Sequence, residues 1–219
     1  MESYRQHPWR VFLFICMFSM AVSRPLQADA GPEAMLQEMT DQVLAEIRKD
    51  PGQLGDIAQV RALADRYVLP RIDFGAVAQW ALGKHWRRAN PQQRARFVAQ
   101  FRELLLNTYL RTVNNYRENE IHFMPSRASS SPDRSVVAAE VEQPGGPPVH
   151  LNFRLHNPGD GWLIYDISVE GVSLVASHRS GFSREIREQG LDGLIARLEA
   201  MNANGGGAGA GKVPDQPSP

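Results

Sequence analysis

The chain has 219 residues, and its 24 basic and 24 acidic side chains give a formal net charge of zero at pH 7. Domains that bind nucleic acid are normally clearly basic, so this balance argues against that class of partner. The sequence holds one cysteine, Cys16, so it cannot form an intramolecular disulfide and must depend on its core for stability.

Residues 1–30 are typical of a secretory signal peptide. Arg5 and Arg10 precede an apolar run at residues 11–22, and residues 28–30 (Ala-Asp-Ala) supply the small side chains needed for cleavage. The apolar run is shorter than the roughly 20 residues of a membrane-spanning helix, which disfavours an uncleaved anchor. Cleavage would remove the cysteine and leave 189 residues with 21 basic and 22 acidic side chains. We therefore predict an exported protein.

The first half of the remaining chain has the periodicity of helices. Apolar residues recur at helical spacing in two segments, which are predicted to end near Asp50 and before Pro70. The apolar positions are Met35, Met39, Val43 and Ile47 in the first segment and Leu54, Ile57, Ala64 and Val68 in the second.

Two further helices have recognisable signals at their ends. Asp73 is expected to cap a short helix that ends at Leu82, with Gly83 as a left-handed terminator. Residues 90–93 (Asn-Pro-Gln-Gln) are an N-terminal signature for a long helix that should run to about residue 116. The inward-facing residues are expected to be Phe74, Val77 and Trp80 in the short helix and Phe97, Phe101, Leu105, Tyr109 and Val113 in the long one.

After residue 120 the period changes to two, which predicts strands at about 121–123, 136–141, 149–155 and 163–169. Short turns between them indicate a four-stranded antiparallel meander with one apolar face. Helices followed by strands define an α+β fold. In the last strand, Leu163, Tyr165, Ile167 and Val169 are expected on the apolar face, and Asp166 on the opposite face.

The end of the chain is predicted to be helical again. Residues 170–171 (Glu-Gly) break the last strand, and residues 172–175 are expected to begin a helical run. Helices at 182–189 and 191–201 should flank the sheet. Residues 203–219 are rich in Gly, Ala and Pro, which is typical of a disordered tail.

Ser173 is a candidate nucleophile with a simpler explanation. Residues 171–175 (Gly-Val-Ser-Leu-Val) approach the nucleophile elbow G-x-S-x-G, but Val175 stands where that strained turn needs glycine. We interpret Ser173 as a turn or helix-capping residue.

Asp73, His122 and Asp166 could act as general acid and base if they met in a cavity. Asp73 is better explained as a helix cap, and Asp166 can pair across the sheet with Arg154. The histidines lack metal-ligand spacing: His150 and His156 would lie about 20 Å apart along one strand. His85 and His122 are isolated in the sequence. We therefore predict no metal site and no enzyme activity.

Residues 84–88 (Lys-His-Trp-Arg-Arg) form a short basic and aromatic cluster before the long helix. Such a cluster can meet a lipid phosphate, a membrane surface or an acidic partner. It can equally be a solvated loop with Trp86 anchored in the core. The sequence leaves both interpretations open.

Several segments, taken together in order and spacing, resemble one known family. They are Arg71-Ile72-Asp73-Phe74, Leu82-Gly83-Lys84-His85-Trp86, Gln93-Arg94-Ala95-Arg96-Phe97 and Phe101-Arg102-Glu103-Leu104-Leu105, followed by Trp162, Tyr165-Asp166, residues 171–175, Arg179 and Phe182. This series resembles the MlaC (toluene-tolerance) family of periplasmic phospholipid-binding proteins.

The resemblance implies a soluble periplasmic carrier whose lipid-binding domain spans residues 31–202. It implies an NTF2-like cavity in which an apolar pocket between sheet and helices holds phospholipid acyl chains, with phospholipid as cargo and no cofactor. It also implies a monomer with transient partners, an inner-membrane ABC transporter complex and an outer-membrane lipoprotein–porin complex. Shuttling lipid between the two would maintain the asymmetry of the outer membrane.

The candidate lipid-binding residues are the apolar positions on the predicted sheet face, the long helix and the segments next to them. Val172, beside the turn, is expected at the mouth of the pocket. The full set is Ile72, Phe74, Val77, Trp80, Trp86, Phe97, Phe101, Leu105, Tyr109, Val137, Ala139, Val141, Leu151, Phe153, Leu155, Tyr165, Ile167, Val169, Val172 and Val175.

The residues alone also fit a filled core. In that case the protein would be a periplasmic adaptor domain that acts only through protein contacts. An NTF2-like enzyme with a catalytic cavity is the third possibility.

Overall fold

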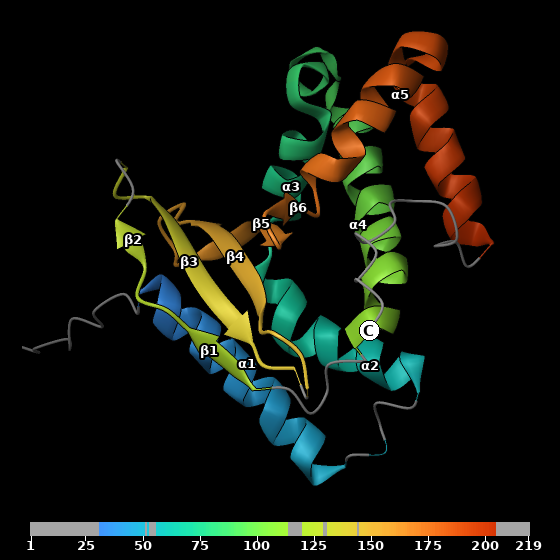
Figure 1. The fold of residues 1–219 in the computed structure, drawn as a ribbon. Helices are drawn as coiled ribbons and strands as arrows, with labels where there is room; N and C mark the ends of the chain where they lie inside the picture. Colours follow the sequence, from blue (N-terminus) through green and yellow to red (C-terminus); the bar gives the residue numbers. More distant parts are fainter. Residues whose placement is uncertain are drawn as a thin grey trace, which may run out of the picture.

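The computed structural model describes residues 31–50, 52, 56–113, 120–128, 131–143 and 145–204. The predicted signal peptide, Leu54, the predicted helix end near residue 116 and the predicted tail beyond residue 204 lie outside these residues. Within them, no helix combines the length and the apolar character that crossing a membrane requires. The described chain folds into helices and one antiparallel sheet (Figure 1).

The first helices follow the predicted pattern, with two differences. α1 spans Pro32–Lys49 and α2 spans Ile57–Leu63, and helical turns continue through η2 (Ala64–Val68) and η3 (Leu69–Arg71). Pro70 therefore does not end the helical path as predicted, because it lies in the first turn of a new short helix, where its missing N–H is not needed. Ile57 is 49% exposed instead of inward, because it is the first residue of α2 and Val60 turns to the core.

α3 spans Phe74–Leu82 and has the predicted ends. The Oδ1 atom of Asp73 accepts a 2.9 Å hydrogen bond from the N–H of Ala76, which confirms Asp73 as the N-cap. Gly83 follows with φ 54° and ψ −120°, so its φ is positive as predicted but its ψ is not that of a left-handed helix. η4 (Gly83–Arg88) then leads toward the long helix.

α4 spans Pro91–Val113 and begins with the predicted capping box. The Oδ1 atom of Asn90 accepts the N–H of Gln93 at 2.8 Å, and the Oε1 atom of Gln93 accepts the N–H of Asn90 at 3.1 Å. α5 spans Arg179–Ala203 and is kinked at Gly190, whose φ of 75° is not helical. The kink divides α5 into the two predicted C-terminal helices.

The sheet has six strands in the described part of the chain, in the order β1-β3-β4-β5-β6, with β2 also paired to β3. The predicted four-stranded meander corresponds to β1, β3, β4 and β5, and two short strands are added to it. The α+β class is thus confirmed. The strands are β1 (Ile121–Phe123), β2 (Arg127–Ala128), β3 (Arg134–Val141), β4 (Val149–His156), β5 (Leu163–Val169) and β6 (Val172–Ser173).

The prediction that residues 172–175 begin a helical run is wrong. Val172 and Ser173 form β6, which pairs with Val169 and Ser168 of β5. Glu170 (φ 47°) and Gly171 (φ 79°) both have positive φ, the combination of a type I′ turn, whose twist matches a two-residue hairpin. Helical turns begin only at η6 (Ala176–His178).

A β-bulge in β5 changes which residues face the sheet core. Arg154 pairs with Asp166, but its neighbour Leu155 pairs with Ile164, so Tyr165 is an extra residue. The extra residue reverses the faces of the sheet to which the preceding side chains of β5 point. Ile164 therefore joins Leu155 on the apolar face in place of Leu163, which the simple alternation predicts there.

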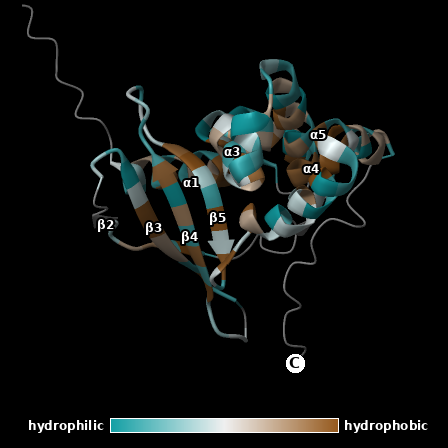
Figure 2. Cartoon of the chain, turned by 90° about the horizontal axis from the view of Figure 1, so that it is seen from above, coloured by the Kyte–Doolittle hydropathy of each residue, from teal (hydrophilic) through white to brown (hydrophobic). Residues whose placement is uncertain are grey.

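The described residues pack into three hydrophobic clusters. α1 covers the apolar face of β3, β4 and β5 and forms the first, which we call the sheet core. α3, α4 and α5 form the second, the helical core, and α2, η2, η3 and α4 form the third. Viewed from above, the sheet lies on one side and α3, α4 and α5 are grouped beside β5 on the other (Figure 2). The seam between sheet and helices runs along β5.

Candidate ligand cavity

A cavity of about 250 Å³ lies along this seam. Most of its lining is apolar, with one carboxylate and two tyrosines as exceptions, which is the composition of a small-molecule pocket. Its volume is slightly below the roughly 300–1,000 Å³ of such pockets. The lining residues are Ala64, Val68, Leu69, Ile72, Phe74, Val77, Leu105, Leu106, Tyr109, Leu110, Ile164, Tyr165, Asp166, Ile167, Leu174 and Val175.

Backbone contacts around Asp73 join the helices to the sheet beside the cavity. Ile72 forms a parallel bridge with Ile164, and the N–H of Asp73 donates to the carbonyl of Ile164 at 2.9 Å. The Nε2 atom of His156 lies 3.0 Å from the Oδ2 atom of Asp73, an ion-pair contact that lacks hydrogen-bond geometry. Ile72 packs against all three hydrophobic clusters. The start of α3 is therefore fixed to β5 at one point.

Among the described residues that line the cavity, Asp166 is the only charged one, and it is 2% exposed. Its Oδ1 atom accepts a 2.7 Å hydrogen bond from the hydroxyl of Ser173 and a 3.4 Å bond from the N–H of Val175. Its Oδ2 atom lies 3.6 Å from the Nε atom of Arg154, which confirms the predicted cross-sheet pair, but it accepts no hydrogen bond from the described residues. The carboxylate is thus only half satisfied.

Burial raises the pKa of Asp166 above its ordinary value, against the opposing effects of Ser173, Val175 and Arg154. Burial also raises the pKa of Tyr109, and the negative charge of Asp166 adds to that shift. Both groups line the cavity, Asp166 from β5 and Tyr109 from α4. They indicate an interior in which charge is disfavoured.

The segment after β5 forms one wall of the cavity. The N–H of Leu174 donates to the carbonyl of Ile167 at 2.8 Å, and the hydroxyl of Ser173 accepts the N–H of Ala176 at 2.9 Å. These bonds hold Leu174 and Val175 against β5. The interpretation of Ser173 as a capping residue agrees with them, since its hydroxyl is engaged on both sides.

The structure divides the predicted lipid-binding residues into groups. Eight of them line the cavity: Ile72, Phe74, Val77, Leu105, Tyr109, Tyr165, Ile167 and Val175. Four belong to the helical core or pack against it: Trp80, Trp86, Phe97 and Phe101. Five belong to the sheet core under α1 or pack against it: Val137, Ala139, Leu151, Phe153 and Leu155.

Three predicted residues lie elsewhere in the sheet. Val141 and Val169 are half-buried. Val172 is 42% exposed on β6 and is not among the lining residues, so the structure does not place it at a cavity mouth. The reason is the hairpin, which turns Val172 along the edge of the sheet instead of into a helix.

Other lining residues are absent from the predicted set. Leu106 and Leu110 each follow a predicted residue of α4, and a wider apolar stripe would have included them. Ile164 enters through the bulge, which has no signal in the sequence, and Asp166 was predicted on the face opposite the apolar one. The remaining residues of this kind are Ala64, Val68, Leu69 and Leu174.

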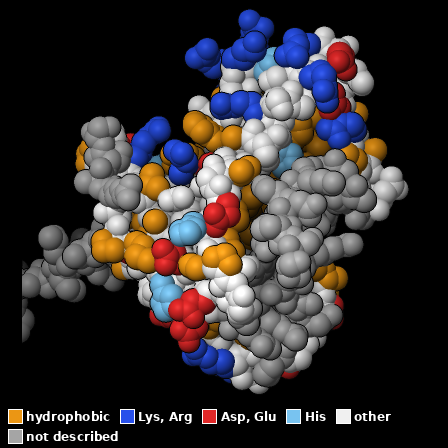
Figure 3. Space-filling view, viewed as in Figure 1, with side chains coloured by type: hydrophobic (Ala, Val, Ile, Leu, Met, Phe, Trp, Pro, Cys, Tyr) orange, Lys and Arg blue, Asp and Glu red, His pale blue; other side chains and the backbone are white. Residues whose placement is uncertain are grey.

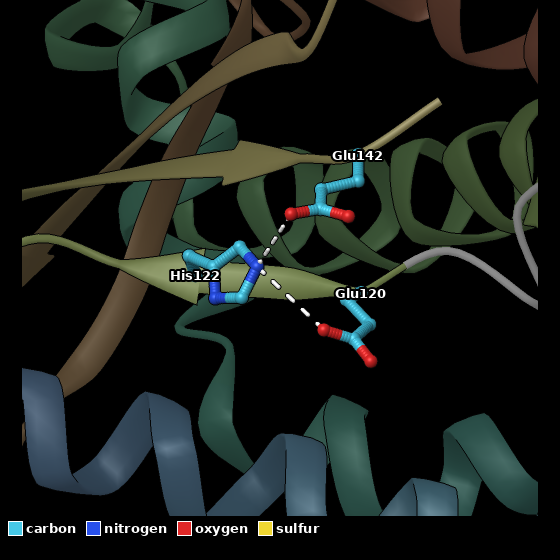
Figure 4. Close-up of side chains that lie close together, drawn as sticks. All are labelled: Glu120, His122 and Glu142. Carbon is cyan, nitrogen blue, oxygen red and sulfur yellow. Dashed lines mark hydrogen bonds and ion pairs between the residues drawn. The ribbon is translucent and has the colours of Figure 1, made fainter. Parts of the chain in front are cut away.

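The candidate acid–base residues are not brought together. Asp73 caps α3 and Asp166 lies in β5, whereas His122 lies in β1, with β3 and β4 between. His122 is not isolated, however. Its Nε2 atom lies 3.0 Å from Oε1 of Glu142 and 3.8 Å from Oε2 of Glu120 (Figure 4). All three side chains are exposed, and this group could hold a cation only at the surface, away from the cavity.

An α+β domain with an apolar cavity between sheet and helices belongs to the class of small-ligand-binding proteins. The model of the MlaC protein family matches residues 37–200, and the chain therefore belongs to this family. The resemblance noted in the sequence is thereby confirmed.

Known proteins that are similar to this chain include two relatives and one solved structure. The intermembrane phospholipid transport system binding protein MlaC of Haemophilus influenzae is 22% identical over 195 residues, which cover 87% of this chain and 91% of that protein. The toluene tolerance protein ttg2D of Pseudomonas putida is 24% identical over 164 residues, which cover 74% and 75%. A phospholipid-binding protein from Ralstonia solanacearum, solved in complex with a phospholipid, is 33% identical with a TM-score of 0.71 and coverage of 81% and 99%.

Proposed function

We propose that this protein is a periplasmic phospholipid carrier that holds the acyl chains of its cargo in the cavity between β5 and the helices. The observation that carries the proposal is the apolar lining, whose described residues include a single charged one, Asp166. The similarity to the Ralstonia solanacearum protein, which was solved with a phospholipid, supports it.

The energetics of the cargo agree with such a cavity. A two-chain phospholipid has about 30 methylenes, and their exposure to water costs on the order of 20 kcal/mol. An apolar pocket offsets most of this cost, while the headgroup remains in water. At about 250 Å³ the cavity must widen to admit two chains, and the seam between sheet and helices is where it can open.

Asp166 sets the orientation of the cargo in this proposal. A phosphate placed beside Asp166 would lose its own hydration and would find no cation among the described lining residues to pair with. The acyl chains therefore enter the cavity and the phosphate stays outside.

In the cell, the carrier would move phospholipid between an outer-membrane lipoprotein–porin complex and an inner-membrane ABC transporter complex, and so maintain outer-membrane lipid asymmetry. It would act as a monomer and without chemical change to the lipid. The predicted signal peptide would deliver it to the periplasm, so osmotic shock should release a protein that begins at Gly31.

Native mass spectrometry of the protein purified without detergent tests the cargo. We expect a mass increment that solvent extraction identifies as phospholipid. A mass that equals the bare chain would instead favour the filled-core adaptor, and release of fatty acid or headgroup from added phospholipid would favour an enzyme.

Two tryptophan substitutions place the cargo in the cavity. Leu105 lines the cavity, and Leu105→Trp should fill the void, remain folded and carry several-fold less phospholipid. Leu82 is 1% exposed in the helical core and lines no void at this site, so Leu82→Trp should destabilise the protein by about 1–3 kcal/mol. The folded fraction of Leu82→Trp should carry as much phospholipid as the wild type. Equal lipid content in folded Leu105→Trp and wild type would contradict this location.

A further inference from the structure

One end of the molecule carries a cluster of exposed cations, which we call the basic end. Figure 3 shows Lys and Arg side chains gathered there, at the top of the view, whereas Asp, Glu and His gather lower down over the sheet. The basic end consists of Lys84, Arg87 and Arg88 of η4 and Arg184 and Arg187 of α5, all of them exposed.

The two elements present their charges to a common region. His85 of η4 is buried, and its pKa is lowered by burial first and then by the charges of Lys84, Arg88 and Arg187. Arg187 therefore lies near η4 although about 100 positions separate the two in sequence. None of the five cations lines the cavity.

The cations of the basic end have no acidic partner in the part of the chain that the structure describes, unlike many other cations there. Among the described residues, none of the five forms an ion pair, whereas Arg96 binds Glu199 at 3.0 Å and Arg197 binds Glu185 at 2.6 Å. Because Glu185 is engaged by Arg197, Glu188 is the exposed carboxylate left on this part of α5. A positive charge therefore remains available to an external partner.

The basic end is also held in place, which a merely solvated loop would not require. Trp86 packs against the helical core, and the guanidinium of Arg94 lies 5.0 Å from the centre of its ring. Arg179 donates to the carbonyl of Trp80 at 2.6 Å and lies against Gly83 at the start of η4. Four of the five cations are arginines, whose planar forks suit phosphate oxygens.

We propose that the basic end docks this protein on the surface of an anionic phospholipid bilayer. Each Lys or Arg at such a surface contributes about fivefold in affinity, so five of them support binding that is real but reversible. This docking is separate from cargo binding, because the cavity and the basic end share no residue. It would bring the cavity near the membrane without inserting the protein.

A bilayer fits the basic end better than an acidic protein does. Protein interfaces usually centre on exposed aromatic or aliphatic anchors surrounded by polar groups. The exposed large hydrophobic residues in the described chain are Ile57 and Val172, and neither belongs to η4 or α5. A layer of mobile headgroups needs only charge, which is what the basic end offers.

Co-sedimentation with vesicles tests the proposal. The purified protein is mixed with vesicles of phosphatidylcholine and phosphatidylglycerol (70:30), or of phosphatidylcholine alone, at 50 and 300 mM NaCl. We expect binding to the anionic vesicles at low salt, a loss of most of it at high salt because charges are screened, and none to the neutral vesicles. Failure to bind anionic vesicles would overturn the proposal and leave an acidic protein as the candidate occupant.

Charge-matched variants assign any binding to the basic end. Arg87→Gln/Arg88→Gln/Arg187→Gln should weaken binding about 100-fold, at roughly fivefold per cation. Arg48→Gln/Arg66→Gln/Arg134→Gln removes the same charge from exposed positions elsewhere and should bind like the wild type. Equal losses in both triple variants would show attraction by net charge alone and overturn the assignment. Leu105→Trp should still bind vesicles, since a loss there would mean docking through the cavity.

Discussion

The hydroxyl of Ser173 donates a 2.7 Å hydrogen bond to Oδ1 of Asp166, and this bond ties β6 to β5 at the wall of the cavity. The same hydroxyl accepts the N–H of Ala176 at 2.9 Å, so one side chain connects β5, β6 and η6. Because Asp166 is buried, water does not readily replace Ser173 as its donor. Ser173 thus does more than cap a turn.

Ser173→Ala should lower the free energy of unfolding by about 1–3 kcal/mol, because it leaves a buried carboxylate oxygen without its strongest donor. From the sequence alone, loss of a cap predicts only about 1 kcal/mol. Urea denaturation with an unchanged m-value measures the difference.

Ser177→Ala is the matched control for Ser173→Ala. Ser177 is exposed, and its hydroxyl donates to the carbonyl of Leu174 at 2.7 Å. It should cost less than Ser173→Ala because water can replace the lost bond. Equal costs would mean that the burial of Asp166 does not strengthen its bond with Ser173.

Asp166 should make the protein less stable as pH rises. Its pKa is raised in the folded state, chiefly by burial, so the unfolded chain loses this proton first, from the ordinary value of 3.8 upward. Folded wild type therefore loses stability from about pH 3.8 until the pH passes the raised folded-state pKa. Asp166→Asn, which has no carboxyl proton, should lack this loss.

The measurement is the difference in melting temperature between Asp166→Asn and wild type from pH 4 to pH 8. The attraction of Arg154 for the ionised carboxylate is already part of the folded-state pKa of Asp166, so the slope measures the balance of burial against Ser173, Val175 and Arg154. We expect the melting temperature of Asp166→Asn to increase relative to that of the wild type as pH rises. The opposite slope would show that Ser173 and Arg154 lower the pKa of Asp166 by more than burial raises it.

His178 should make the protein less stable as pH falls. Burial, and secondarily the charge of Arg197, lowers its pKa in the folded protein below the ordinary 6.5. As pH falls through 6.5 the unfolded chain binds a proton that the folded chain does not, so stability falls. His178→Phe keeps the ring that stacks on Phe182 and should reduce this loss between pH 7.5 and 5.5. If the stability of variant and wild type changes with pH to the same extent, His178 is not the cause of the loss at low pH.

Gly83→Ala should be more damaging than Gly171→Ala. Both glycines have positive φ, but a Cβ at Gly83 would also lie 3.3 Å from Nε of Arg179, whereas nothing lies within 4 Å of one at Gly171. Gly171→Ala should therefore cost about 1 kcal/mol and Gly83→Ala clearly more. Thermal denaturation compares them, and equal costs would mean that Arg179 moves aside freely.

The sequence predicted the elements whose signals are local. Asp73 and Asn90 with Gln93 mark helix starts that the structure confirms, and Gly83 has the predicted positive φ, because capping and positive φ depend on a few neighbouring residues. The bulge at Tyr165 and the hairpin at Glu170 were not predicted. A bulge depends on the pairing with β4, and glutamate at positive φ depends on the strands that enclose it.

The same distinction applies to the cavity. Leu105 and Tyr109 were predicted to line it because they share one face of a long helix with other apolar residues. Phe97 and Phe101 lie on that face too, but they are packed against α5. Which part of an apolar stripe borders a void depends on how distant segments meet, and periodicity carries no information about that.

Ile72 touches the sheet core, the helical core and the third cluster, and it also borders the cavity. The bridge from Ile72 to Ile164 is therefore the expected pivot of a hinge motion. In this motion the helices tilt away from the sheet while each core keeps its own packing. Such a tilt would be a hinge motion, whose cost is limited to contacts across the seam. The capacity of the cavity would then depend on an angle between two rigid bodies as well as on the side chains that line it.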